Sequence, residues 1–205
     1  MILPNHNKLY KLFFDFCASL IIKSDFKSII IDVIGNENIQ DKSLLVIANH
    51  FSWWDGILHY HLSNIFFKKK FHVLMLEDQL KKRMFLTKLG VFGVKKGTRD
   101  TIKFMNLAKQ LLRHNDNMLL IFPQGKIESH HKQEFSFESG ASKLIEKNPG
   151  VQVIFSVILI DYFSERKPVA KFYIKYLKEN TIDSIEADYN VFYKECLQKQ
   201  FQLAT

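Results

Sequence analysis

The distribution of apolar and polar residues along the chain predicts an alternation of strands and helices. Nearly continuous short apolar runs are typical of buried strands and occur at residues 28–34, 44–48, 71–76, 91–94, 118–122, 151–160 and 169–177. Apolar residues at helical spacing predict helices at residues 8–22, 52–60, 78–88, 98–114, 140–147 and 185–201. Because strands and helices alternate through most of the chain, we expect an α/β fold with a mixed, largely parallel central sheet flanked by helices.

The first predicted helix is apolar almost all round, and lysines flank it. Such a helix either packs on the rest of the domain or lies in a lipid interface, with its lysines near anionic headgroups. Asp15 interrupts its apolar part, which is shorter than the ~20 residues that a bilayer requires, so we expect neither a membrane span nor a signal peptide. We predict an amphipathic or apolar, membrane-associating helix over residues 1–24 and a single α/β domain over residues 25–205.

Polar residues with candidate chemistry follow the apolar run at 44–48. His50 comes just after it, and Ser52 and Asp55 have the spacing of a helix-capping box. The N-terminus of a helix favours an ionised Asp55, and an ionised carboxylate beside a histidine holds one imidazole tautomer and stabilises the imidazolium. His50 and Asp55 are therefore candidates for a general base and its orienting acid. The alternative is structural, with His50 bonded to backbone and Asp55 only capping the helix, and this stretch alone does not decide between the two.

Two more polar turns are expected at the same edge of the sheet, where such folds place their sites. Lys95, Lys96 and Arg99 follow one strand, and the turn from Pro123 to Lys126 follows another. A histidine base beside cations suits transfer to a hydroxyl on an anionic acceptor. The chain has no G-x-S-x-G elbow, no G-x-x-x-x-G-K-[ST] loop and no metal-ligand cluster beyond the adjacent His130 and His131, so direct transfer from an activated donor is the simplest chemistry.

Composition narrows the class of partner. The chain has 205 residues, a net charge of +8 and a pI near 9.3, which point to a membrane surface, a nucleic acid, or a phosphorylated or CoA-linked substrate. A nucleic-acid-binding module is the rival class that charge and aromatic residues favour, but no recognition motif supports it. Cys17 and Cys196 match no metal or redox spacing and are predicted to be free thiols in a reducing compartment.

These polar blocks, from about residue 28 to residue 178, resemble those of the glycerolipid acyltransferases of the lysophosphatidate acyltransferase (PlsC-like) family. The family's first block, N-H-x-S-x-x-D, is matched by Asn49, His50, Ser52 and Asp55. Its second block is Gly-x-aromatic-x-aliphatic followed by basic residues. The corresponding residues are Gly90, Phe92, Val94 and Lys95, with Lys96 where arginine is usual.

The third and fourth blocks of the family are matched less completely. The third reads F-P-E-G-T-R, and Phe122, Pro123 and Gly125 match it, whereas the departures are Gln124, Lys126 and Ile127. The fourth is an apolar strand with a central proline. Residues 153–158 correspond to it, with Ser156 in place of the proline. The common order and spacing of all four blocks carry the resemblance.

The resemblance implies a glycerol-3-phosphate acyltransferase-like fold and an O-acyl transfer in lipid biosynthesis. A fatty acyl group would pass from acyl-CoA or acyl-carrier protein to a hydroxyl of a lysophosphatidate-like lysophospholipid. His50 would be the general base and Asp55 its partner, with no metal and no cofactor besides the thioester co-substrate. The residues expected to contact substrate are Asn49, Ser52, Lys95, Lys96, Arg99, Pro123, Gln124, Gly125 and Lys126.

The resemblance also implies a place and partners for the enzyme. The expected partners are a lipid acceptor, an acyl thioester donor, acyl-carrier protein where it is that donor, and an anionic membrane surface, with no nucleic acid. We expect a peripheral or monotopic protein at the cytoplasmic face of a membrane. Gln124 and Ile127 leave two alternatives open: an acceptor without phosphate, such as a glycolipid or an amino-acid lipid, and a catalytically inactive lipid-binding relative. The intact His50 and Asp55 argue against the second.

Overall fold

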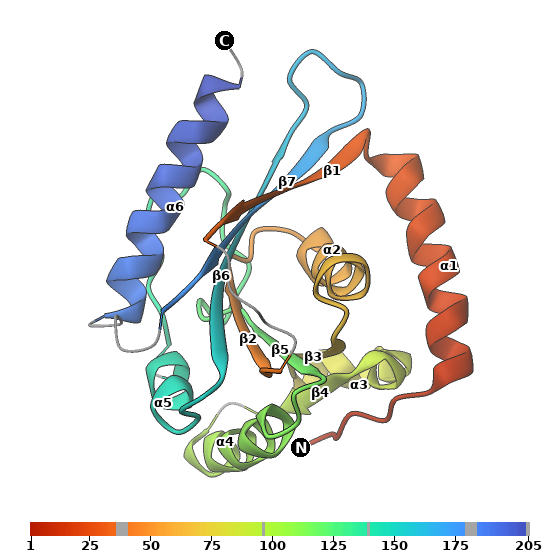
Figure 1. Ribbon diagram of the computed structural model, residues 1–205. Helices are drawn as coiled ribbons and strands as arrows, with labels where there is room; N and C mark the ends of the chain where they lie inside the picture. Colours follow the sequence, from red (N-terminus) through yellow and green to blue (C-terminus); the bar gives the residue numbers. More distant parts are fainter. Residues whose placement is uncertain (36–40, 96, 139, 179–183, 204–205) are drawn as a thin grey trace.

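A seven-stranded sheet with the strand order β1-β7-β6-β2-β5-β3-β4 forms the centre of the computed structural model (Figure 1). The structure describes residues 1–35, 41–95, 97–138, 140–178 and 184–203. The strands are β1 (Ser28–Ile34), β2 (Leu44–Ala48), β3 (Lys70–Leu76), β4 (Val91–Val94), β5 (Asn117–Ile121), β6 (Gln152–Asp161) and β7 (Val169–Tyr176). Neighbouring strands are parallel except β6 and β7, which are antiparallel. The predicted mixed, largely parallel sheet is confirmed.

Helices cover both faces of this sheet. They are α1 (Lys8–Asp25), α2 (Trp54–Leu62), the π-helix η1 (Ser63–Phe67), α3 (Glu77–Lys81), the 3₁₀-helix η2 (Met84–Leu89), α4 (Thr98–Leu112), α5 (Gly140–Glu146) and α6 (Ile185–Gln202). Figure 1 shows α1 and α2 on one face and α4, α5 and α6 on the other. The predicted single helix at residues 78–88 is wrong. Arg83 leaves the helical region (φ −141°, ψ 45°), and the Thr87 hydroxyl then bonds the Met84 carbonyl within η2.

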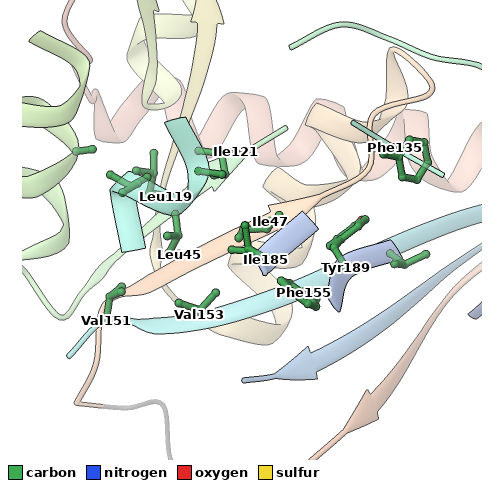
Figure 2. Packing of buried hydrophobic residues seen from close by; sticks show 14 of the residues in the cluster. Leu45, Ile47, Leu119, Ile121, Phe135, Val151, Val153, Phe155, Ile185 and Tyr189 are labelled. Atoms are coloured by element: carbon green, nitrogen blue, oxygen red, sulfur yellow. The ribbon is translucent and has the colours of Figure 1, made fainter. Parts of the chain in front are cut away.

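Two apolar clusters, one on each face, hold the layers together. All five residues of β2 are buried, as expected for a central strand that is covered on both faces. Alternate residues of β2 enter different clusters, so that Leu45 and Ile47 face α4, α5 and α6 while Val46 faces α1 and α2. Figure 2 shows the first cluster, in which side chains of β2, β5 and β6 meet Ile185 and Tyr189 of α6.

Helix α1 packs on the domain through one side only. Ala18 and Ile22 are buried, and Asp15 accepts a hydrogen bond from the hydroxyl of Tyr60 on α2 (2.6 Å). The opposite side is an exposed apolar stripe, with side chains between 53% and 80% exposed, formed by Leu9, Leu12, Phe13, Phe16 and Leu20. Within the described residues, no helix combines the length and the hydropathy that crossing a membrane would need. The functional division at residue 24 stays a prediction.

Candidate active site

Two loops at the carboxyl edge of the sheet form the candidate site. Strands β2 and β5 are parallel neighbours, with Ile47 opposite Ile121, so the loops that follow them begin side by side. The backbone N–H of His50 donates to the side-chain oxygen of Gln124 (2.7 Å). The backbone N–H of Glu128 in turn donates to the carbonyl of His50 (2.9 Å). The structure thus brings together the predicted His50 turn and the predicted Pro123–Lys126 turn.

The third predicted turn follows β4, which is one of the two edge strands of the described sheet. Because β5, β3 and β4 are all parallel, this turn opens at the same edge, but β3 separates it from β5. Lys95 is exposed, whereas Lys96 and the side chain of Arg99 lie outside the described part of the chain. Contact between these cations and the His50 turn therefore stays a prediction.

A short hydrogen bond joins His50 to Asp55. Nδ1 of His50 donates to Oδ2 of Asp55 (2.7 Å), and the same oxygen accepts the backbone N–H groups of Phe51 (2.7 Å) and Ser52 (2.8 Å). Oδ1 accepts the hydroxyl of Ser52 (2.7 Å). Asp55 is fully buried, so these four donors supply the partners that a buried carboxylate needs. With the proton of the ring held on Nδ1, the lone pair of His50 lies on Nε2, and 22% of the side chain remains exposed.

The predicted capping box is present in modified form. Asp55 reaches back to the N–H of Ser52, as the acidic member of a capping box does. The Ser52 hydroxyl accepts the N–H of Trp54 (3.1 Å), and α2 begins at Trp54, two residues after Ser52. Asp55 therefore caps the helix and orients His50 with the same carboxylate, so the structural and the catalytic interpretations of this residue are compatible.

Phe122 supports the imidazole of His50 from its face. The two rings are stacked, with centroids 4.2 Å apart and an interplanar angle of 17°. Together with the hydrogen bond that Nδ1 donates to Asp55 at the ring edge, this contact fixes the plane of the imidazole. Sequence reasoning had used Phe122 only as a motif match. The signal was its position, directly after an apolar strand and before Pro123.

A second histidine, His59 on α2, is fully buried beneath this pair. Its Nδ1 donates to the backbone carbonyl of Asp55 (2.7 Å), and its Nε2 accepts a hydrogen bond from the hydroxyl of Ser156 on β6 (3.0 Å). Desolvation by burial lowers the pKa of His59 from 6.5 to about 4, so the ring is neutral near pH 7. Ser156, which stands where the family has proline, thus satisfies a buried imidazole. Sequence reasoning missed His59, although its position one helical turn after Asp55 was a signal.

Asn49 and Ser52 lie beneath the surface of the site. The Asn49 side chain is only 1% exposed, and its amide bonds both the N–H (2.9 Å) and the carbonyl (3.0 Å) of Ile158 on β6. It thereby continues the pairing of β2 with β6 beyond the end of β2. The hydroxyl of Ser52 is engaged by Asp55 and Trp54. Both residues have a structural task here, and their predicted contact with substrate stays a prediction.

The turn after β5 carries a charged residue that the sequence analysis missed, Glu128. The amide of Gln124, itself 5% exposed, donates to Oε2 of Glu128 (3.1 Å), while Lys132 (2.6 Å) and Lys126 (3.4 Å) contact Oε1. The hydrogen bond from Lys132, followed by those from Gln124 and Lys126, lowers the pKa of Glu128, so its side chain is a carboxylate at neutral pH. Its sequence position beside two lysines carried no signal of this role.

The backbone conformation of this turn favours glycine at position 125. Its φ of +66° lies in the left-handed region, which favours glycine. A Cβ atom at this position would also lie 2.6 Å from a carboxylate oxygen of Glu138. Pro123 accepts a backbone hydrogen bond from Glu138 (2.8 Å), so the turn and the segment near residue 138 are held together.

Comparison with known proteins agrees with this geometry. The acyltransferase family profile matches residues 30–159, which is more than half of the chain and extends from β1 into β6. The matched segment includes His50, Asp55 and the turn from Phe122 to Glu128. A search of curated proteins gives no match. The length of the family match shows that the chain belongs to the PlsC-like acyltransferase family and is a transferase that moves acyl groups from an acyl donor to a lipid acceptor.

Proposed function

We propose that this enzyme transfers a fatty acyl group from acyl-CoA or acyl-carrier protein to a hydroxyl of a lysolipid, with His50 as general base and Asp55 as its orienting partner. The observation that carries the proposal is the 2.7 Å hydrogen bond between Nδ1 of His50 and Oδ2 of Asp55. The carboxylate is buried and fixed by three further donors, whereas the histidine is partly exposed. A rigid carboxylate behind an accessible imidazole is the arrangement that general-base catalysis needs.

In the proposed reaction, Nε2 of His50 removes the proton of the acceptor hydroxyl as its oxygen attacks the thioester carbonyl. Asp55 stabilises the imidazolium that forms, and Phe122 keeps the ring in plane. The tetrahedral intermediate then expels the thiolate. The imidazolium returns its proton to the sulfur, so the products are an ester and a free thiol, and His50 is neutral again.

The neutral state of His59 suits this cycle. A charged imidazole directly beneath Asp55 would repel the positive charge that develops on His50. Burial keeps His59 neutral, and its hydrogen bond to the carbonyl of Asp55 holds the first turn of α2 in place. His59 thus supports the pair through geometry and does not add a competing charge.

A lipid acceptor also requires the enzyme to meet a membrane, and we infer that the exposed apolar stripe of α1 does so. Leu9, Phe13, Phe16 and Leu20 repeat at helical spacing on one side of α1. Burial of apolar surface contributes about 25 cal/mol per Å², and basic residues near an anionic surface add about 1 kcal/mol each. Lys8 and Lys23 flank the stripe. This supports a peripheral or monotopic enzyme on the cytoplasmic face of an anionic membrane.

Acyl transfer can be tested with the full chain, labelled acyl-CoA or acyl-carrier protein, and a panel of lysolipids in vesicles. We expect mass spectrometry to detect an acylated lipid with the wild type and a rate lower by roughly 10²–10⁴-fold with His50→Ala. Equal rates for the two proteins would exclude His50 as the base. Absence of any acylated lipid with the wild type, for every donor and acceptor, would support the inactive lipid-binding alternative.

A further inference from the structure

The turn after β5 carries a carboxylate, Glu128, that pairs with two nearby lysines. Glu128 contacts Lys132 at 2.6 Å and Lys126 at 3.4 Å. Its side chain is 9% exposed, and its backbone N–H bonds the carbonyl of His50, so this carboxylate is fixed to the loop that carries the base. Both lysines of the turn are therefore already paired with an anion.

Other side chains near the turn also affect its net charge. The carboxylate of Glu138 lies against Gly125. Gln124 has no charge and directs its amide toward Glu128. Ile127, where the family has arginine, is apolar and 55% exposed. The charges of Glu128, Glu138, Lys126 and Lys132 cancel, so these four side chains give the turn no net positive charge.

A phosphate monoester is expected to bind weakly at this turn. It carries a charge of about −1.5 to −2 near neutral pH and is held by charge-assisted hydrogen bonds from cations. To obtain them from Lys126 or Lys132, it would have to draw these lysines away from Glu128. The largely buried carboxylate would then keep only the neutral amide of Gln124 as a partner and would lie close to a second anion, which is costly. A hydroxyl lipid without a phosphate monoester meets no such repulsion and can contact Ile127.

We propose that Glu128 makes this enzyme selective against phosphate monoesters, so that its acceptor is a hydroxyl lipid whose headgroup carries no phosphate monoester. The inference rests on the proposed function, because it names the acceptor class for the same acyl transfer. Glu128, together with Gln124 and Ile127, thereby receives a specificity-determining role that is distinct from the roles of His50 and Asp55.

The test uses two acceptors that differ only in the phosphate, 1-acylglycerol and 1-acylglycerol-3-phosphate with the same acyl chain, in vesicles with the full-length enzyme. We expect the wild type to prefer 1-acylglycerol by about tenfold or more in kcat/KM. Glu128→Gln keeps an oxygen for the Gln124 amide and removes the charge. This variant is expected to raise kcat/KM for the phosphate acceptor, relative to that for 1-acylglycerol, about tenfold.

Two further variants sharpen the result. Glu134→Gln removes the exposed carboxylate that pairs with Lys194 of α6, so it makes the same change in net charge and should leave the acceptor ratio unchanged. Ile127→Arg adds a cation at an exposed position without disturbing the buried network, and we expect it to increase use of the phosphate acceptor.

Each possible outcome is decisive. A wild type that prefers 1-acylglycerol-3-phosphate would overturn the proposal, and so would an acceptor ratio that neither Glu128→Gln nor Ile127→Arg changes. If 1-acylglycerol and its phosphate are both left unacylated while other lysolipids are acylated, the acceptor class proposed here is wrong and the acyl transfer stands. If no lipid is acylated at all, the proposed function fails together with this inference.

Discussion

The hydroxyl of Ser156 on β6 lies 3.0 Å from Nε2 of His59 on α2, although 97 residues separate the two in the chain. His59 has no contact with solvent, and its other nitrogen bonds the carbonyl of Asp55. The serine thus completes a chain of contacts that begins in the central sheet and ends at the carboxylate behind His50. Proline, which the family has at this position, could not donate this hydrogen bond.

Replacement of Ser156 by alanine should therefore destabilise the fold. The variant leaves a buried imidazole nitrogen without a partner, which costs about 1–3 kcal/mol. We expect a lower free energy of unfolding in urea, while Ser142→Ala, at an exposed serine of α5, should have no measurable effect. An unchanged unfolding curve for Ser156→Ala would mean that the hydrogen bond contributes nothing to stability.

Stability should also depend on pH through three histidines, of which His59 and His72 are buried and His6 is half-buried. Burial lowers the pKa of His59 from 6.5 to about 4, and desolvation lowers those of His6 and His72 to about 4 and about 3. The unfolded chain therefore binds more protons than the folded chain below pH 6.5. We expect the free energy of unfolding to fall as pH decreases from 6.5 toward 4, with up to about 1.4 kcal/mol per pH unit from His59.

Chemical denaturation at several pH values between about 5 and 7 measures this slope. This interval includes the ordinary histidine pKa of about 6.5. His59→Gln should make the slope shallower, whereas His114→Gln, at an exposed position, should leave it unchanged. A wild-type free energy of unfolding that is constant across this range would contradict the neutral, buried state of these imidazoles.

The variant Asp55→Asn distinguishes the role of Asp55 in orienting His50 from its role in capping α2. An asparagine can turn its NH₂ group toward the Ser52 hydroxyl and keep its oxygen toward His50, Phe51 and Ser52, so most of the hydrogen bonds survive and the charge is lost. We expect kcat to fall by roughly 10²–10⁴-fold with only a small decrease in Tm. Asp55→Ala, which removes every acceptor, should lower Tm much more. Loss of stability in Asp55→Asn without loss of activity per folded molecule would reduce Asp55 to a cap.

Gln124 and Glu128 should behave as a coupled pair. Gln124→Glu would place a carboxylate oxygen where an amide now donates to Glu128 at 3.1 Å, so two anions would face each other in a largely buried turn. We expect this variant to lose stability and activity, and Glu128→Gln in the same chain to restore both. A double-mutant cycle should give a coupling free energy of about 1 kcal/mol or more. Additive effects would show that the two positions are independent.

Local sequence patterns predicted the contact between His50 and Asp55 but not the contact between Gln124 and Glu128. His50 and Asp55 are five residues apart and joined by one turn, so local rules of capping and acid–base pairing were sufficient to place them. The continuous apolar run of β2 likewise predicted a strand buried on both faces. Local patterns account for these elements.

Contacts that depend on the register of the sheet were not predictable in this way. His50 meets Gln124 only because β2 and β5 are parallel neighbours, and His59 meets Ser156 only because β6 lies on the other side of β2. The order of strands decides both, and no local pattern specifies it. Glu128 was missed for a related reason. A glutamate near lysines in the sequence is typical of an exposed surface residue, and only the structure shows that this side chain is largely buried.

The exposed apolar stripe of α1 gives the last prediction, which concerns membrane binding. Deletion of residues 1–23 would remove the stripe, but it would also remove the buried side chains of Ala18 and Ile22 and the hydrogen bond from Tyr60 to Asp15. Loss of vesicle binding by this variant could therefore reflect a folding defect. Simultaneous replacement of Leu12, Phe13 and Phe16 by serine changes only side chains that are at least 64% exposed. We expect this variant to keep its Tm and to lose cosedimentation with anionic vesicles, because each large apolar side chain contributes about 1.5–3 kcal/mol when buried.

The enzymatic consequence separates docking from catalysis. Acylation of a membrane-embedded acceptor should slow with the triple-serine variant, whereas turnover of a short, water-soluble acceptor should not, since the stripe lies outside the site at His50. Phe201→Ser, which removes an equally exposed aromatic side chain from α6, is the matched control and should bind vesicles as the wild type does. Added salt should weaken but not abolish wild-type binding, because salt screens the lysines and leaves apolar burial intact. Undiminished binding by the triple-serine variant would place the membrane-facing surface elsewhere on the protein.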